Sequence, residues 1–135
     1  MIKRILFICK YNRFRSRIAE ALFKKFNKNN NIKVKSAGII KGEYPLDKTQ
    51  VEVAKKLGIN LFGKPKGIST DLLKWQDIII IVADDVPSSI FNNKSFGKKT
   101  LIWKINDVES NNQEEIEKII IEIKKRIIRL KKELE

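Results

Sequence analysis

Apolar and polar positions follow two kinds of pattern along the chain, one typical of buried strands and one typical of helices. The N-terminal run, residues 2–8, contains a short continuous apolar stretch at residues 5–8, which predicts a strand buried on both faces. Over residues 19–26 the apolar side chains recur three and four positions apart, which predicts the apolar face of a helix. An asparagine cluster at residues 27–31 should end this helix, and the alternation in residues 32–36 predicts a second strand.

The next part of the chain predicts two more helices. Apolar positions within residues 51–57 indicate the first, with Gly58 as its C-terminal stop. Either Ser69 or Thr70 can cap a second, short helix that runs through Trp75.

Two strands and a long helix complete the pattern. Residues 78–82 are a run of Ile and Val that predicts a buried strand, and residues 100–103 predict another. From Asn112 onward isoleucines lie along one side of a helix whose first turns are acidic and whose last turn is basic, which suits the helix dipole.

Strands that alternate with helices favour a parallel sheet covered by helices on both faces. The prediction is therefore an α/β fold with a four-stranded parallel sheet. A chain of 135 residues with 42% hydrophobic content can build one core, so we expect a single domain over residues 1–135. Ligands of such sheets bind beyond the carboxyl ends of the strands, and Cys9 lies at that end of the first strand.

Composition narrows the possible classes of function. The chain has one cysteine and no histidine, which excludes an internal disulfide and a multi-thiolate metal site and removes the commonest zinc and iron ligands. We expect no metal and no cofactor. Because no apolar stretch reaches the length of a membrane span and the N-terminal run has no small-residue cleavage site, we expect a cytoplasmic protein without a membrane partner.

The net charge of +13 is a common sign of an acidic partner such as nucleic acid. Here the basic residues are spread along the chain and form no platform interleaved with aromatic residues. A general bias toward Lys, Ile and Asn explains the charge better, and it argues against nucleic-acid binding as the main function. A positive field would still attract phosphorylated substrates.

Residues 9–16, called the Cys9 loop below, read CKYNRFRS and carry the candidate chemistry. A lone cysteine after an apolar strand is more often an inert core thiol than a nucleophile. Here Arg15 and Ser16 follow at the start of a predicted helix, so the loop N–H groups can surround an anion at the helix N-terminus. Arg15 can hold two phosphoryl oxygens at once, and the same positive potential stabilises the reactive thiolate of Cys9. The expected phosphate-binding residues are Lys10, Tyr11, Asn12, Arg13, Phe14 and Arg15.

The pattern Cys-x5-Arg-Ser near the N-terminus resembles the active-site signature of the low-molecular-weight protein tyrosine phosphatase family, whose fold is related to that of thioredoxin-coupled arsenate reductases. Further similar segments occur in the family's order along the chain: Asn12 and residues 36–38, 56–59, 77–84 and 103–107. The resemblance implies a phosphatase I-like three-layer sandwich.

The resemblance also implies a two-step phosphoryl transfer. Cys9 would attack in line to form a phosphocysteine, while Arg15 and the loop amides hold the equatorial oxygens. Asp107 would protonate the leaving oxygen and then accept a proton from the hydrolytic water. Ser16 would hydrogen-bond the sulfur, and Asn12 would shape the loop. The implied substrates are phosphotyrosine proteins or small phosphate esters, with inorganic phosphate and other oxyanions as competitive ligands.

The acid assignment is where the chain departs most from the family. Relatives usually have Asp-Pro at this point, and this chain has Asp107 followed by Val108. Asp84 and Asp85 are the alternative acids, although carboxylates that cap a helix near Pro87 are the more ordinary interpretation of that pair.

Two departures lie within the Cys9 loop. Tyr11 replaces a glycine that commonly precedes the asparagine, which raises the question of its backbone conformation, because a positive φ is uncommon for tyrosine. Phe14 replaces a second cysteine, so oxidised Cys9 has no neighbouring thiol with which to form a disulfide. Tandem tyrosines that some eukaryotic members carry after the acid are also missing, and we expect a prokaryotic member.

Other functions remain open. An arsenate reductase would need an external thiol, because Cys9 has no second cysteine for a relay. A phosphoarginine substrate would meet the added positive charge of Arg13. A non-catalytic phosphate or phosphopeptide sensor is the alternative of a different class. Lys10 and Arg13 either contact the substrate's surroundings or are ordinary surface charges, and both tryptophans are expected in the core.

Overall fold

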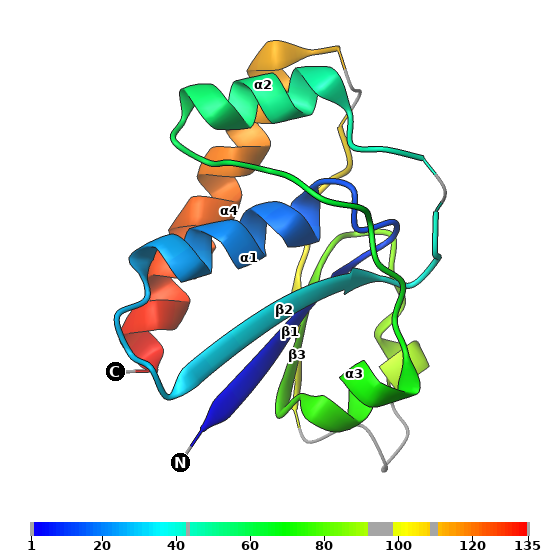
Figure 1. Cartoon of the computed structure of the whole chain (residues 1–135), viewed down its shortest axis with the longest axis vertical. Helices are drawn as coiled ribbons and strands as arrows, with labels where there is room; N and C mark the ends of the chain where they lie inside the picture. Colours follow the sequence, from blue (N-terminus) through cyan, green and yellow to red (C-terminus); the bar gives the residue numbers. More distant parts are fainter. Residues whose placement is uncertain (1, 43, 92–98, 109–110, 135) are drawn as a thin grey trace.

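A parallel β-sheet forms the centre of the computed structural model, which describes residues 2–42, 44–91, 99–108 and 111–134 (Figure 1). Within these residues the sheet has four strands: β1 (Lys3–Cys9), β2 (Ile32–Gly38), β3 (Ile78–Val82) and β4 (Thr100–Trp103). Their order is β2-β1-β3-β4, and β1 pairs in parallel with both β2 and β3. The predicted four-stranded parallel sheet is confirmed, and the strand that leads into the Cys9 loop lies inside it.

The two central strands are buried on both faces, as their continuous apolar sequences predicted. Every residue of β3 is buried, and so are residues 5–9 of β1. Because successive strand side chains point to opposite faces, Ile5 and Phe7 pack into one hydrophobic cluster while Leu6 and Ile8 pack into another.

Helices α1 (Arg15–Phe26), α2 (Lys48–Lys56) and α4 (Gln113–Glu133) pack on one face of the sheet (Figure 1). The long helix α4 lies beside α1 and buries a stripe of side chains spaced three or four residues apart. These side chains are Ile116, Ile120, Ile123, Ile127 and Leu130. This face holds the larger of the two hydrophobic clusters.

The opposite face is covered by α3 (Thr70–Trp75) and the short 3₁₀ helix η1 (Ser88–Phe91). Phe91 is buried there, and Trp75 packs partly buried against the same cluster. Trp103 lies in the other cluster with its ring 5.9 Å from that of Phe7. Helices on both faces confirm the α/β three-layer sandwich.

Helix ends are fixed by local polar contacts. Asp47, Ser69 and Asn112 are the N-caps of α2, α3 and α4, and each side chain accepts a backbone N–H three residues later. Ser69, rather than Thr70, therefore caps α3. Gly58 has a φ of +81°, the left-handed conformation that ends α2.

Helix α2 starts before its apolar pattern does because the Asp47 cap lies upstream of it.

None of the helices in the described residues combines the length and apolarity needed to cross a lipid bilayer.

Candidate active site

The Cys9 loop connects the carboxyl end of β1 to the first turn of α1. Cys9 is the last residue of β1 and pairs with Gly38 of β2, and Arg15 is the first residue of α1. Unlike α2, α3 and α4, helix α1 has no side-chain cap at its N-terminus. Its first N–H groups are therefore available to an anion, as the sequence predicted.

Asn12 gives the loop its shape. It has a φ of +57°, the one positive φ of a non-glycine residue in the described part of the chain. Asparagine is among the residues that tolerate this left-handed conformation. Tyr11 does not have a positive φ, so its replacement of the family's glycine places no strain on the tyrosine backbone.

The Asn12 side chain ties the loop to three other segments. Its Nδ2 donates hydrogen bonds to Ser16 Oγ at 2.7 Å and to Ser36 Oγ at 3.0 Å. Its Oδ1 accepts the backbone N–H of Lys66 at 2.9 Å. Asn12 is buried, and these contacts pair the polar atoms that burial removes from water.

Gly38 lies directly beneath the loop. A Cβ atom at this position would lie 2.6 Å from the Tyr11 carbonyl carbon and 2.7 Å from Asn12 N. Any larger residue would therefore push the loop backbone away from β2. This contact explains why residues 36–38, Ser-Ala-Gly, end in glycine.

The Cys9 sulfur is buried and surrounded by hydrogen-bonding groups. Asn12 N–H donates to Sγ at an N···S distance of 3.3 Å, and Ser16 Oγ lies 3.0 Å from Sγ. Because Ser16 Oγ already accepts a hydrogen bond from Asn12, its hydroxyl hydrogen can point to the sulfur. These are the contacts that a thiolate accepts.

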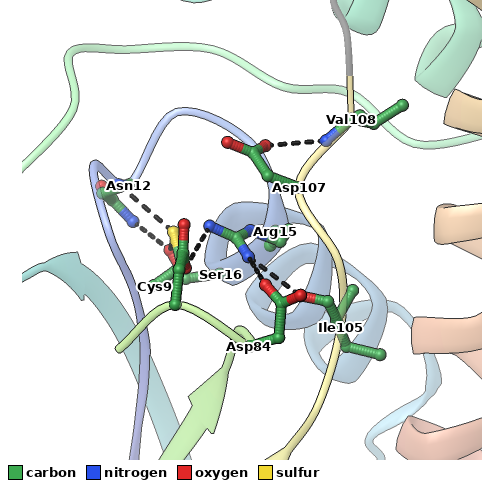
Figure 2. Close-up of polar contacts among 9 residues, drawn as sticks. Cys9, Asn12, Arg15, Ser16, Asp84, Ile105, Asp107 and Val108 are labelled. Carbon is green, nitrogen blue, oxygen red and sulfur yellow. Dashed lines mark hydrogen bonds and ion pairs between the residues drawn. The ribbon is translucent and has the colours of Figure 1, made fainter. Parts of the chain in front are cut away.

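Arg15 is buried and paired with acidic residues in this structure. Its Nη1 donates to the Ile105 carbonyl at 2.9 Å, and its Nη2 donates to Asp85 Oδ1 at 2.9 Å. Asp84 forms a longer contact to Nη1, at 3.5 Å (Figure 2). Both carboxylates pair with the guanidinium, a contact that the interpretation of Asp84 and Asp85 as helix caps near Pro87 did not include.

Asp107 lies on the segment after β4 and lines the same cavity as Cys9 and Arg15. In Figure 2, Asp107 and Asp84 lie on opposite sides of the Arg15 guanidinium. The Asp107 carboxylate is exposed and accepts the N–H of Val108 at 2.9 Å. Proline has no N–H, so the valine supplies an orienting contact that the family's usual Asp-Pro pair lacks.

The cavity above Cys9 is small, about 100 Å³. It is lined by Cys9, Tyr11, Arg13, Phe14, Arg15, Asp47, Gln50, Asp107 and Val108. Arg13 donates its Nε–H to the Pro45 carbonyl at 3.0 Å and stacks over the Tyr44 ring. Lys10 lies over Tyr11 and is not among the lining residues.

Arg17 supports the loop from outside the cavity, a role that the sequence did not suggest. It donates to the carbonyls of Asn12 and Phe62, both at 2.7 Å, and to that of Lys64. Burial lowers the pKa of Arg17, while the nearby Glu20 and Cys9 act in the opposite direction. No sequence signal marks this role, because its partners in the 58–66 segment lie far along the chain.

Residues 4–135 match the family model described as low molecular weight phosphotyrosine protein phosphatase. The chain belongs to this family. The resemblance seen in the Cys9 loop and the later segments is therefore confirmed, and family membership supports an enzyme of the phosphatase type.

Solved structures of several kinds share the family's fold. A low-molecular-weight protein tyrosine phosphatase from T. tengcongensis has 25% identity and a TM-score of 0.83, over 97% of this chain and 99% of that one. An arsenate reductase from Archaeoglobus fulgidus has 26% identity and a TM-score of 0.74, over 94% and 98%. The YwlE arginine phosphatase from Geobacillus stearothermophilus has 23% identity and a TM-score of 0.83, over 98% and 92%. Proteins with different named activities therefore share this fold, so the fold alone does not determine the activity.

Proposed function

We propose that this protein hydrolyses phosphate monoesters through a phosphocysteine intermediate formed on Cys9. The observation that carries this proposal is the position of the Cys9 sulfur. It lies at the open N-terminus of α1, with Asn12 N–H and Ser16 Oγ in hydrogen-bonding contact. Such contacts stabilise a thiolate, which is the form of cysteine that attacks phosphorus. One domain, residues 1–135, would carry the whole activity.

Substrate binding would use the N–H groups of residues 10–15 and the Arg15 guanidinium. The Nη2 of Arg15 donates to Asp85 in the structure described above, so a phosphoryl group would compete with this carboxylate. The Nη1 contact to the Ile105 carbonyl can remain and hold the guanidinium plane. Bidentate binding of two phosphoryl oxygens by Arg15 would then complete the site.

In the first step Cys9 Sγ forms a bond to phosphorus while the bond to the leaving oxygen breaks, and Asp107 gives that oxygen its proton. In the second step water attacks the phosphorus, the S–P bond breaks, and Asp107 takes a proton from the water. The Ser16 hydroxyl, 3.0 Å from Sγ, would stabilise the departing thiolate. Asp107 suits the acid role better than Asp84 or Asp85, because both of those carboxylates pair with Arg15.

The proposed substrates are phosphotyrosine proteins or small aryl phosphates. Tyr11 at the cavity offers an aromatic surface to a phenyl ring, and its side chain is partly exposed. Arg13 lines the same cavity, so the positive charge of a phosphoguanidinium would be opposed there. We therefore expect phosphotyrosine to be preferred over the phosphoarginine substrate that the name of the YwlE relatives implies. Inorganic phosphate and other oxyanions would compete for the Cys9 loop, and the cytoplasm is the proposed location.

Arsenate reduction is the second candidate, favoured by the similarity to the Archaeoglobus fulgidus enzyme. Cys9 is the one cysteine of the chain. After its attack on arsenate, the disulfide that releases arsenite would have to form with an external thiol such as glutathione. A sensor without catalysis is less well supported, because Asp107 lies at the cavity beside the nucleophile.

Hydrolysis of p-nitrophenyl phosphate tests the proposal. We expect turnover by the wild type, none by Cys9→Ala, and a fall of about 10²-fold or more for Asp107→Ala, in the range of general acid catalysis. Asp84→Ala is the matched control and should retain turnover. An inactive wild type, or full activity of Cys9→Ala, would exclude the mechanism. If Asp84→Ala were inactive while Asp107→Ala turned over normally, the acid assignment would be wrong. Glutathione-dependent arsenate reduction faster than ester hydrolysis would favour the second candidate.

A further inference from the structure

A second cavity lies behind the Cys9 loop, between the exposed side of α1 and residues 58–66. Figure 1 shows this segment leaving α2 and running back past α1. The cavity has a volume of about 610 Å³, which is within the range of small-molecule sites. It shares no lining residue with the cavity above Cys9.

The lining of this cavity is strongly basic. Its charged residues are Arg17, Glu20, Lys24, Lys25, Lys64 and Lys66, five cations and one carboxylate. Glu20 accepts hydrogen bonds from Ser36 and Lys24, so its charge is already paired. Among the residues described here, the ammonium groups of Lys64 and Lys66 have no hydrogen bond or ion pair. The cavity therefore favours an anion, and these two lysines can bind it without breaking an existing contact.

Phe62 gives the cavity an aromatic surface. It is 79% exposed, the highest value among the large hydrophobic residues described. Its backbone is held, because Arg17 donates to its carbonyl and Gly63 turns the chain next to it with a φ of +87°. An exposed ring on this held backbone, at a cavity also lined by the apolar residues Ile59 and Leu61, is suited to stacking with a planar ligand.

We propose that this cavity binds a small molecule that combines a planar aromatic ring with several phosphate groups, the chemistry of a nucleoside polyphosphate. The ring would stack on Phe62, and the phosphates would contact Lys64 and Lys66. This binding does not depend on the proposed hydrolysis at Cys9. The bound ligand would be linked to the Cys9 loop through Arg17, which lines the cavity and donates to the Asn12 carbonyl at 2.7 Å.

Calorimetric titration with adenosine 5′-(β,γ-imido)triphosphate tests the proposal on the full chain. We expect Lys64→Gln combined with Lys66→Gln to raise the Kd at least tenfold, and Phe62→Ala to raise it at least fivefold. The matched control, Lys118→Gln combined with Lys125→Gln on the exposed side of α4, should leave the Kd within twofold. Inorganic triphosphate should bind at least fivefold more weakly than the nucleotide, and adenosine should show no binding.

The place of binding can be followed through backbone amide signals in nuclear magnetic resonance spectra. We expect the nucleotide to shift the signals of Ile59, Phe62 and Gly63. No binding, shifts confined to the Cys9 loop, or a Kd that is insensitive to the lysine pair would overturn the proposal. Inorganic triphosphate or adenosine binding as tightly as the nucleotide would also overturn it. Loss of ester hydrolysis is not among these readouts, so failure here is distinct from failure of the proposed function.

Discussion

Asn12 combines a left-handed backbone with side-chain hydrogen bonds to Ser16, Ser36 and Lys66. The side chain thus joins the loop to α1, to β2 and to the segment after α2. A residue with this conformation is maintained only when its surroundings fix it. The Asn12 side chain is therefore one of the contacts that order the Cys9 loop.

Replacement of Asn12 separates its backbone role from its side-chain role. We expect Asn12→Ala to lower the free energy of unfolding by about 2–4 kcal/mol, because three hydrogen bonds are lost and alanine disfavours a positive φ. Asn12→Gly loses the same hydrogen bonds but tolerates the φ, and it should be destabilised less. Urea unfolding measures both variants, and equal stability of the two would contradict the backbone part of this account.

Asp85 and the phosphoryl group of a substrate would compete for the Arg15 guanidinium. The guanidinium is needed for phosphate, and it is bound to a carboxylate that is one-third exposed. A pair at this exposure contributes about 1 kcal/mol. The pair keeps Arg15 ordered without ligand, and phosphate must replace one of its contacts.

Removal of the Asp85 charge should therefore tighten oxyanion binding. We expect Asp85→Asn to lower the inhibition constant of inorganic phosphate about fivefold, the factor that corresponds to about 1 kcal/mol. Asp71→Asn, which removes the same charge on exposed α3, is the control and should leave this constant unchanged. The inhibition constant is measured from competitive inhibition of p-nitrophenyl phosphate hydrolysis by inorganic phosphate. Weaker inhibition of Asp85→Asn than of the wild type would contradict the competition between Asp85 and phosphate for Arg15.

The sequence predicted best the positions of residues that lie close to one another along the chain. Cys9, Arg15 and Ser16 lie at one strand-to-helix junction, so their spacing alone predicted that they meet. Arg17 and the pairing of Asp85 with Arg15 were not predicted, because their partners lie 45 to 70 residues away along the chain. Such contacts depend on the packed fold, which hydrophobic periodicity does not specify in detail.

At the scale of elements, the contact between β2 and the Cys9 loop controls the geometry of the site. The two segments touch at Gly38, where no Cβ can be accommodated. The alternation in residues 32–36 predicted the strand but not its last two residues, because Ala37 and Gly38 continue the pairing with β1 after the alternation ends. The continuous apolar runs predicted β1 and β3 well, because a strand that is buried on both faces has apolar residues at successive positions.

Gly38→Ala tests this contact. We expect kcat/KM for p-nitrophenyl phosphate to fall at least tenfold, because a displacement of about 1 Å in a catalytic group can lower the reaction rate up to about 10²-fold. Gly42→Ala is the matched control, since a Cβ there would meet only the Tyr11 side chain at an ordinary 3.9 Å. Equal activity of the two variants would show that the loop does not depend on the close approach of β2.

At the scale of the whole molecule, the two hydrophobic clusters hold the sheet between its helical layers. The larger cluster joins β1 and β3 to α1, α2 and α4, and Ile123 is fully buried within it. The Cys9 loop lies at the carboxyl edge of this sheet. The core therefore supports the site, and the smaller cluster includes Cys9 itself.

A core substitution should separate stability from activity. We expect Ile123→Ala to lower the free energy of unfolding by about 2–5 kcal/mol through the cavity that it leaves. Ile121→Ala, on the same helix but 47% exposed, should stay within about 0.5 kcal/mol of wild type. Urea unfolding measures both, and kcat of the folded Ile123→Ala protein should be unchanged. A large loss of stability in the exposed variant alone would contradict this description of the core.

The shared fold of phosphatases and an arsenate reductase leaves the reaction to be decided at the sulfur of Cys9. The most direct measurement is acid quenching of the wild type during turnover of p-nitrophenyl phosphate, followed by mass spectrometry of the peptide that contains Cys9. Cys9→Ala is the control, because a serine hydroxyl could itself accept a phosphoryl group. We expect one phosphoryl group on the wild-type peptide and none on the variant. Turnover without any phosphoryl group on Cys9 would contradict the phosphocysteine mechanism.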